Sequence, residues 1–320
     1  MKATNGLAVY SVYCDTSLAR AMNYKLLFPT CRARYRWVLQ TLQQAYADEP
    51  CAEMLNVGCG EGDFDRALKQ HCDRLVSIDV DAEDVAHARQ LNLDCVGLDY
   101  DVQDGLDLPY EDGRFNAVTC LEVIEHVSDC HRLLGELARV VKPGGSVVIT
   151  CPSAEFPVTY DPINWLLAHV GKHVSIGAYG YGHSWLIREE DIFEWASSVH
   201  LEVVSIERLA KSLASTFECY WPSVFQRMLK ANAGNQVGGR HGVYSLRPTN
   251  GEPLLVGLTD HLIDLDRRLF ADSRRSVGLG IHLRKPLQST NIKSTRVARA
   301  DAAEPPPTSS RVASASAQTA

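Results

Sequence analysis

The segment 54–64, Met-Leu-Asn-Val-Gly-Cys-Gly-Glu-Gly-Asp-Phe, restricts the fold of this chain more than any other. Its apolar start leads into alternating glycines at Gly58, Gly60 and Gly62, and a second apolar run ends about twenty residues later at Asp79. Glycine has no Cβ, so the backbone can turn sharply out of a strand and a ligand can approach its N–H groups. The pattern predicts a strand, a glycine turn, a helix and a second strand that ends in a carboxylate, as in nucleotide-binding βαβ units.

The spacing of the glycines discriminates between cofactors. Asp79 would accept hydrogen bonds from both hydroxyls of a ribose. The dinucleotide fingerprint is G-x-G-x-x-G, in which the extra residue positions a pyrophosphate on the helix N-terminus, whereas this chain has G-x-G-x-G. Glu61 lies inside the turn and would repel a phosphate. We therefore expect a nucleoside cofactor without phosphates, such as S-adenosylmethionine, and disfavour an NAD(P)-dependent oxidoreductase.

Four segments, in this order along the chain, resemble the class I S-adenosylmethionine-dependent methyltransferases, in the branch that contains the ubiquinone-biosynthesis methyltransferases. The resemblance covers about residues 50–210. Its segments are 56–62, 77–79, 101–110 running on to 114–118, and 140–145 with the sequence Val-Val-Lys-Pro-Gly-Gly. One departure is Asn116, where the family usually has Asp.

The resemblance implies a doubly wound α/β fold with a mainly parallel, seven-stranded, Rossmann-like sheet of order 3-2-1-4-5-7-6, whose seventh strand is antiparallel. It places the methionine moiety over residues 58–62, the ribose on Asp79, and the adenine amino group on the acid just after strand three. Asp101 is our first choice for that acid and Asp104 the second. The expected cofactor-binding residues are Asn56, Gly58, Cys59, Gly60, Gly62, Asp79, Asp101, Val102 and Glu122.

Hydrophobic periodicity predicts how the rest of the chain is organised. Residues 1–48 are expected to form an N-terminal helical cap, 49–285 the methyltransferase domain with helical insertions at 152–185 and 212–275, and 286–320 a disordered tail rich in Ala, Ser, Thr and Pro. Strands are predicted near 53–58, 74–79, 95–99, 115–121, 146–151, 201–208 and 277–284. Helices alternate with the first six, which indicates a mainly parallel sheet covered on both faces.

Both insertions follow strands at the end of the sheet where ligands bind in open α/β folds. The first is rich in aromatic residues and histidines. The second carries amphipathic helices that we expect to pack on their own domain, with docking on a membrane surface as the alternative. Its apolar residues include Phe217, Leu254, Leu255, Leu258, Leu262, Leu265 and Leu269.

The group that would carry chemistry is Glu122-Val-Ile-Glu125-His126, after strand four. If a helix opens here, all three polar side chains project from one face. The resemblance implies that Glu122, Glu125 and His126, with His183 downstream, ligate a divalent cation, which would lower the pKa of an acceptor hydroxyl. Alternatively no metal binds and His126 caps or packs. Without a metal, His126 is the first candidate for a catalytic base and His183 the second.

Two tyrosines, Tyr160 and Tyr181, are more remote candidates for that base. Methyl transfer requires little covalent chemistry from the protein, since the sulfonium is already an activated donor. Alignment of the reactants can contribute about 7–11 kcal/mol at its limit. A general base adds roughly 10²–10⁴ in rate. We therefore expect the cofactor turn to matter more than any one base.

Composition agrees with an enzyme that is not a nucleic-acid binder. The 320 residues, 45% of them apolar, can fill a sizeable core, while a net charge of −7 argues against binding a phosphate backbone. No apolar stretch reaches about 18 residues. The ten cysteines include no C-x-x-C pair, which favours reduced thiols and a cytoplasmic location.

From the sequence we expect an S-adenosylmethionine-dependent methyltransferase that acts on a small molecule, with no nucleic-acid partner. The favoured acceptor is an oxygen nucleophile on a quinone-like, lipid-linked or sugar compound. The main alternative is a non-catalytic module that only binds S-adenosylmethionine. The sequence leaves the oligomeric state open.

Overall fold

The structure, a computed structural model, describes residues 23–174, 186–218 and 249–287 of the 320-residue chain. Its centre is a seven-stranded sheet in the order β3-β2-β1-β4-β5-β7-β6. The strands pair in parallel, except that β7 is antiparallel to β5 and β6. Their bounds are β1 Cys51–Val57, β2 Cys72–Asp79, β3 Leu98–Val102, β4 Phe115–Leu121, β5 Val141–Pro152, β6 Glu202–Leu209 and β7 Gly278–Arg284. The predicted doubly wound α/β fold is confirmed.

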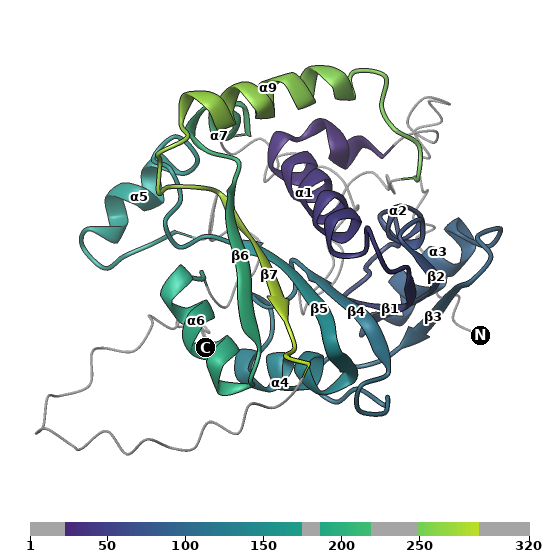
Figure 1. Ribbon diagram of the computed structural model, residues 1–320. Coiled ribbons are helices and arrows are strands. Elements are labelled where there is room, and N and C mark those ends of the chain that lie inside the picture. The colour runs from purple at the N-terminus through teal and green to yellow at the C-terminus, as the bar shows by residue number, and fades with distance from the viewer. Residues whose placement is uncertain (1–22, 175–185, 219–248, 288–320) are drawn as a thin grey trace, which may run out of the picture.

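Helices cover both faces of this sheet (Figure 1). On one side of β5, β6 and β7 lie α1, α7 and α9, and on the other lie α4 and α6. The helix bounds are η1 Tyr24–Leu27, α1 Pro29–Ala45, α2 Asp65–Lys69, α3 Ala82–Leu91, α4 Cys130–Val140, α5 Pro162–Ala168, α6 Glu189–Ser198, α7 Ser212–Glu218 and α9 Val256–Leu269. The edge strands β3 and β6 therefore lie at opposite ends of the molecule.

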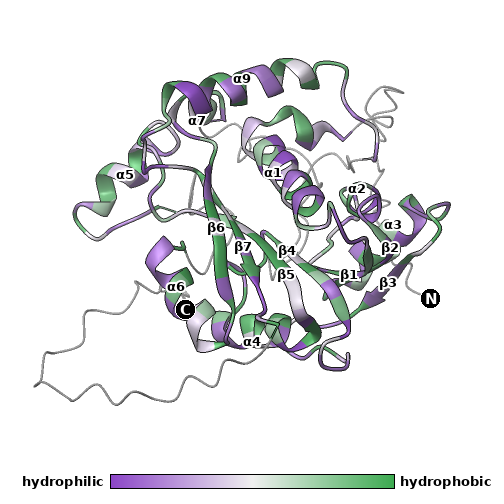
Figure 2. Ribbon diagram, viewed as in Figure 1, coloured by the Kyte–Doolittle hydropathy of each residue, from purple (hydrophilic) through white to green (hydrophobic). Residues whose placement is uncertain are grey.

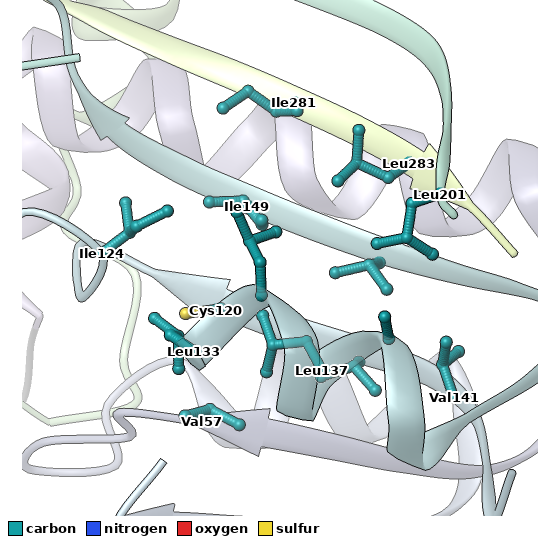
Figure 3. Close-up of a cluster of buried hydrophobic side chains, with 14 of the residues drawn as sticks. Val57, Cys120, Ile124, Leu133, Leu137, Val141, Ile149, Leu201, Ile281 and Leu283 are labelled. Carbon is teal, nitrogen blue, oxygen red and sulfur yellow. The ribbon is translucent and has the colours of Figure 1, made fainter. Parts of the chain in front are cut away.

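Successive strand residues point to opposite faces, so the mainly hydrophobic central strands fill two separate cores (Figure 2). The core on the α4 face contains Leu55, Val118, Val147 and Ile149 with Leu133 and Leu137 of that helix (Figure 3). The core on the α1 face contains Met54, Ala117 and Val148 with Val38 and Leu42 of α1. Each face is thus fixed by the alternation within single strands.

Two predicted strands, β3 and β5, differ by three or more residues at their start, and the others by at most two. β3 begins three residues later than predicted, because Val96 and Gly97 form a turn in which Gly97 has φ +78°. β5 begins at Val141, earlier than predicted, since Val141 already pairs with Phe115 of β4. The first correction matters for the site, because it changes which acid follows strand three.

The apolar face of α9 is the clearest departure from expectation. Leu254, Leu255, Leu258, Leu265 and Leu269 are exposed, whereas Thr259, Ile263 and Asp266 are buried against the domain. Hydrophobic positions accordingly recur along the outer helix in Figure 2. The helix itself packs on its own domain as expected, against α1 and α7, but these leucines do not make that contact. Within the described ranges, no helix has both the length and the apolar character needed to cross a bilayer.

Candidate cofactor and acceptor site

The glycine turn follows β1 and is held at the end of β2. Gly58, Gly60 and Gly62 have φ of +78°, +50° and +74°, a region that favours glycine. The N–H groups of Gly58 and Cys59 donate to the carbonyl oxygen of Ile78 at 2.8 and 2.9 Å. A Cβ on Gly60 would have no heavy atom within 4 Å, so the middle of the turn faces open space. This is where a ligand can approach the backbone.

Asp79 ends β2 beside this turn, as predicted. Its Oδ2 accepts the N–H of Gly60 at 2.8 Å, and its Oδ1 accepts the N–H of Asp81 at 3.0 Å. Each carboxylate oxygen has a further lone pair that a ribose hydroxyl can use. Val102 pairs with Asp79 in the sheet and is 43% exposed, which offers an apolar surface next to the carboxylate.

Both candidate acids for the adenine amino group lie at the carboxyl end of β3, and the choice between them stays a prediction. β3 ends at Val102, so Asp101 lies within the strand, where its carboxylate accepts from Val102 N–H and the Gln103 side chain. Asp104 is the acid that follows the strand. It lies beside Gly105, whose added Cβ would be 2.9 Å from Val57 at the end of β1. The strand boundary therefore favours Asp104, our second choice, over Asp101.

A buried polar network that the sequence did not reveal supports the turn from below. Asn56 donates to Asp65 at 2.7 Å and accepts from the Thr119 hydroxyl at 2.8 Å. Both polar atoms of Asn56 are thus bonded within the protein. Burial raises the pKa of Asp65 from 3.8 to about 6. An Asp nine residues after an Asn at the end of a strand gives no local sign of this contact.

A second group that the sequence did not reveal covers the turn from the N-terminal side. The ammonium of Lys25, in η1, lies 3.0 Å from Asp63 Oδ1 and 3.8 Å from Glu61 Oε2. Asn23 donates to the other oxygen of Asp63 at 2.8 Å. Burial lowers the pKa of Lys25, but the charges of Asp63 and Glu61 outweigh it and raise the pKa overall. The Lys25 charge therefore offsets part of the repulsion between Glu61 and an anion.

The segment 122–126 does not open a helix, which corrects the predicted shared face. Glu122 has φ +57°, an uncommon conformation for a residue with a side chain, and α4 begins only at Cys130 with Asp129 as its N-cap. Glu122 Oε2 lies 3.0 Å from the Arg34 guanidinium of α1. A Cβ on Gly58 would be 2.1 Å from Val123, so this segment packs directly on the glycine turn.

The two carboxyl groups in this segment occupy different environments. The Glu125 side chain is 1% exposed, and neither of its oxygens has a hydrogen-bond partner among the described residues. Burial, and then the charge of Glu122, raise the pKa of Glu125 well above its ordinary range. His126 Nε2 lies 3.8 Å from Glu125 Oε1. Burial thus favours the protonated form of Glu125, while Glu122 is paired with a guanidinium.

These residues do not fit the predicted metal centre. Over the described ranges, no three His, Cys, Asp or Glu side chains gather as a ligand set. Arg34 already supplies a positive charge to Glu122, and a neutral carboxylic acid is a poor ligand. The fourth predicted ligand, His183, and the remote candidate Tyr181 lie outside the described residues.

A hollow elsewhere on the molecule does not involve the predicted site. It has a volume of about 470 Å³ and is lined by residues of α1, β6, β7 and α9, such as Trp37, Arg208 and Asp264. None of the glycine-turn residues lines it.

Tyr160 lies near Phe156, with ring centroids 6.2 Å apart, beyond the end of β5. The candidate site is therefore defined by the turn and the ends of β1, β2 and β4.

Comparisons with known proteins agree with this geometry. Residues 55–149 match a family model described as a methyltransferase domain. A ubiquinone biosynthesis O-methyltransferase of Xanthomonas campestris pv. campestris is 39% identical over 164 residues, which cover 49% of this chain and 65% of that protein. The protein of that name from Coxiella burnetii is 31% identical over 157 residues, covering 48% and 64%. The chain thus matches less than two thirds of either relative.

A solved structure supports the fold alone. The (4+2) cyclase SpnF is similar with a TM-score of 0.50 and 18% sequence identity, covering 79% of this chain and 82% of SpnF. The sheet order, the glycine turn with Asp79 and the domain match agree with one another. Residues 55–149 match a methyltransferase domain, within a sheet whose order is the one the resemblance to the class I S-adenosylmethionine-dependent methyltransferases implies.

Proposed function

We propose that this protein transfers the methyl group of S-adenosylmethionine to an oxygen nucleophile of a small molecule. The observation that carries the proposal is the glycine turn, whose open middle residue, Gly60, donates to the Asp79 carboxylate at 2.8 Å. This arrangement offers backbone N–H groups and a ribose acceptor at one point, without the longer glycine spacing that a pyrophosphate needs.

The residues around the turn fit this cofactor. In our proposal the methionine end lies over 58–62, the ribose on Asp79, and the adenine between Val102 and Asp104, which replaces Asp101 as the partner of the amino group. The bound cofactor supplies an activated methyl group. The protein's own part is to hold the acceptor in line with it, and Val123, packed on Gly58, puts the 122–126 segment next to the reacting end.

The acceptor is proposed to be a phenolic or quinol-type hydroxyl. Support comes from the two relatives named ubiquinone biosynthesis O-methyltransferase. His126, whose side chain is 17% exposed beside Glu125, is the proposed proton acceptor, and His183 remains a second expectation outside the described residues. A lipid-linked acceptor, with contact between the protein and a membrane surface, would give the exposed leucines of α9 a role.

A second candidate function is a binding module, or an enzyme of another reaction, on the same fold. The (4+2) cyclase SpnF has a similar fold, so the fold alone does not establish methyl transfer. The two functions differ in whether the methyl group moves.

Labelled methyl transfer tests the proposal. The protein would be incubated with S-adenosylmethionine labelled in its methyl group and with a catechol or an extract of the source organism. We expect a labelled, base-stable ether product that is absent with the Asp79→Ala variant. Calorimetry in parallel should give binding of S-adenosylmethionine and none of NAD. Binding without any labelled product would favour the binding module, and preferential binding of NAD would overturn the cofactor.

A further inference from the structure

Two glycines of β7, Gly278 and Gly280, leave room on the α1 face of the sheet for two long side chains of α1. A Cβ at Gly278 would lie 2.9 Å from Arg34 Nε, and one at Gly280 would lie 2.6 Å from the Trp37 ring. Both glycines pair with residues near the carboxyl end of β5. Arg34 therefore lies at the edge of the sheet where ligands bind in open α/β folds.

The guanidinium of Arg34 ends beside Glu122, where β4 leaves the sheet. Its Nη1 lies 3.0 Å from Glu122 Oε2. Glu122 is fixed in turn, because its N–H donates to the Thr150 carbonyl oxygen of β5 at 2.9 Å. The next residue, Val123, packs on Gly58 of the glycine turn. One positive charge is thus held between the ends of β4 and β5, one residue away from the contact with the turn.

The hydrogen bonding of this ion pair is incomplete. A guanidinium has five N–H donors, and within the described ranges Glu122 is the one residue to which Arg34 is paired. Arg34 Nε and Glu122 Oε1 are buried atoms that have no hydrogen-bond partner in that part of the chain. Nearly all buried polar groups of folded proteins have one, so these atoms require an explanation. Because the Arg34 side chain is 19% exposed, a ligand at the strand ends can reach the guanidinium.

Arg34 stays charged in this position. Burial lowers its pKa, but the charge of Glu122, followed by those of Tyr160 and Glu125, raises the pKa overall. A metal ion bound to Glu122 would have to displace this guanidinium. The arrangement therefore disagrees with the metal centre that the family resemblance implies, and it offers a cation of its own in that place.

We propose that the Arg34 guanidinium is the cation of the acceptor site, and that an N–H which Glu122 leaves free donates to the acceptor oxygen and favours its ionised form. The inference rests on the proposed methyl transfer to a phenolic or quinol-type hydroxyl, and it names the group that takes the place of a metal ion. Arg34 keeps its own proton, so the proton of the hydroxyl passes to a base or to water. A fixed donor of this kind stabilises the charge on the oxygen without reorganisation.

Absorbance titration of 4-nitrocatechol, whose ionised form is strongly coloured, tests the proposal without turnover. The probe is mixed with the protein, S-adenosylhomocysteine and a chelator, and its ionised fraction is followed against pH. In the wild type, the pKa of the bound probe should be lower than that of the free probe by about 1–3, the range for one opposite charge nearby. Arg34→Gln should lose this difference. Arg34→Lys should keep part of it, since an ammonium retains the charge but not the planar fork.

Two further variants separate this role from a purely structural one. Gly278→Ala leaves Arg34 in the chain but puts a methyl group 2.9 Å from its Nε, so the guanidinium must move. The pKa difference should then shrink while the affinity for S-adenosylhomocysteine is retained. Arg36→Gln removes an arginine of the same helix that pairs with Asp260 and Asp264, and it should leave the pKa difference unchanged.

An unchanged pKa of the probe bound to the wild type, or the same lowered pKa in Arg34→Gln, would show that Arg34 is not the cation of this site. A lowered pKa that appears only when Mg²⁺ replaces the chelator would assign the place to a metal ion. If Arg34→Gln does not fold, a full pKa difference in Gly278→Ala would overturn the proposal. A wild type that does not bind the probe would instead overturn the phenolic acceptor of the proposed function, so the two failures are distinguishable.

Discussion

Single residues of the turn differ in what they tolerate, although all three glycines have positive φ. At Gly58 a Cβ would be 2.1 Å from Val123, whereas at Gly60 it would meet nothing. We expect Gly60→Ala to cost only about 1 kcal/mol of stability, the strain of a left-handed residue, and yet to lose cofactor affinity because the methyl projects into the ligand's space. Gly58→Ala should lose both stability and cofactor affinity. Urea unfolding and calorimetry of the two variants measure this.

The contrast between the two alanine variants is the informative result. If Gly60→Ala kept full affinity for S-adenosylmethionine, the open side of the turn would not be the ligand side, and the placement of the methionine end would have to be abandoned.

Asp79 should contribute to cofactor binding through its charge. Asp79→Ala removes the ribose acceptor, and we expect a loss of about 1.5–3 kcal/mol of binding free energy for each charged hydrogen bond. Asp81→Asn is a matched control, because Asp81 is a nearby acid whose carboxylate caps α3. Titration calorimetry with S-adenosylmethionine compares the two. An unchanged affinity in folded Asp79→Ala would contradict the ribose assignment.

Local signals were readable from the sequence, and contacts between distant residues were not. Gly58, Gly60, Gly62 and Asp79 lie within one βαβ unit, where spacing alone predicts geometry. Arg34 reaches Glu122 from the N-terminal helix, and no local pattern announces such an ion pair. The same holds for Lys25 and its partners Asp63 and Glu61, which lie in a separate element.

At the scale of elements, the error at 122–129 has a physical cause. Spacing of three and four residues suggested a helix, but Glu122 turns into the left-handed region so that its N–H can donate to the Thr150 carbonyl oxygen of β5 at 2.9 Å. Asp129 then provides the N-cap that starts α4 at Cys130. The capping residue was present in the sequence, and it marks the later start.

The N-terminus of α1 should make stability depend on pH. Glu218 accepts from the N–H and the hydroxyl of Thr30 at 2.7 and 2.8 Å, and burial raises its pKa from 4.5 to about 7. The folded state binds this proton more tightly than the unfolded state does. Stability from this group is therefore greatest below about pH 4.5 and falls as the pH rises to about 7.

Glu218→Gln isolates that contribution. The free energy of unfolding of the wild type, relative to the variant, should fall by up to roughly 3 kcal/mol between about pH 4.5 and about pH 7. Above that range it should stay level. Denaturant unfolding at several pH values measures the difference. A difference that does not vary with pH would show that the pKa of Glu218 is the same in the folded and unfolded states, and would contradict the prediction.

The orientation of α9 gives a sharp contrast between neighbouring residues. Ile263 is 9% exposed and packs in the small core that includes Ala33 and Val277, whereas Leu258 is 71% exposed. Ile263→Ala should cost about 2–5 kcal/mol, while Leu258→Gln should stay within about 0.5 kcal/mol. Denaturant unfolding of both variants tests the helix rotation. A large loss for Leu258→Gln would mean that the leucine face is covered.

At the scale of the whole molecule, the alternation of strand and helix was enough to predict a mainly parallel sheet covered on both faces, because such crossovers are right-handed. The strand order came from the resemblance. The part of the site that would hold the methyl acceptor was harder to predict. It combines α1, the end of β4 and the region after β5, whose mutual placement follows from packing of the complete chain. The predicted insertion 152–185 and the tail 286–320 fall partly outside the described residues.

The charges at the acceptor end lead to a prediction about metals. Glu122 is paired with Arg34, and burial raises the pKa of Glu125 well above its ordinary range, which disfavours the charged carboxylate that a divalent cation needs. We expect elemental analysis of the purified protein to find less than one metal ion per chain. Methyl transfer and S-adenosylmethionine affinity should both survive exhaustive chelation.

A chelator-sensitive activity, restored by Mg²⁺ or Mn²⁺, would contradict this prediction. It would require Glu122 to exchange its partner Arg34 for a cation, and Glu125 to give up its proton. Arg34→Gln discriminates between the two arrangements, with Arg36→Gln of the same helix as the matched control, because Arg36 pairs with Asp260 and Asp264 instead. If the guanidinium is the resident cation, only the Arg34 variant loses turnover while S-adenosylmethionine affinity is retained. If a metal ion is the resident cation, turnover should follow the metal concentration in the wild type and in both the Arg34 and the Arg36 variants.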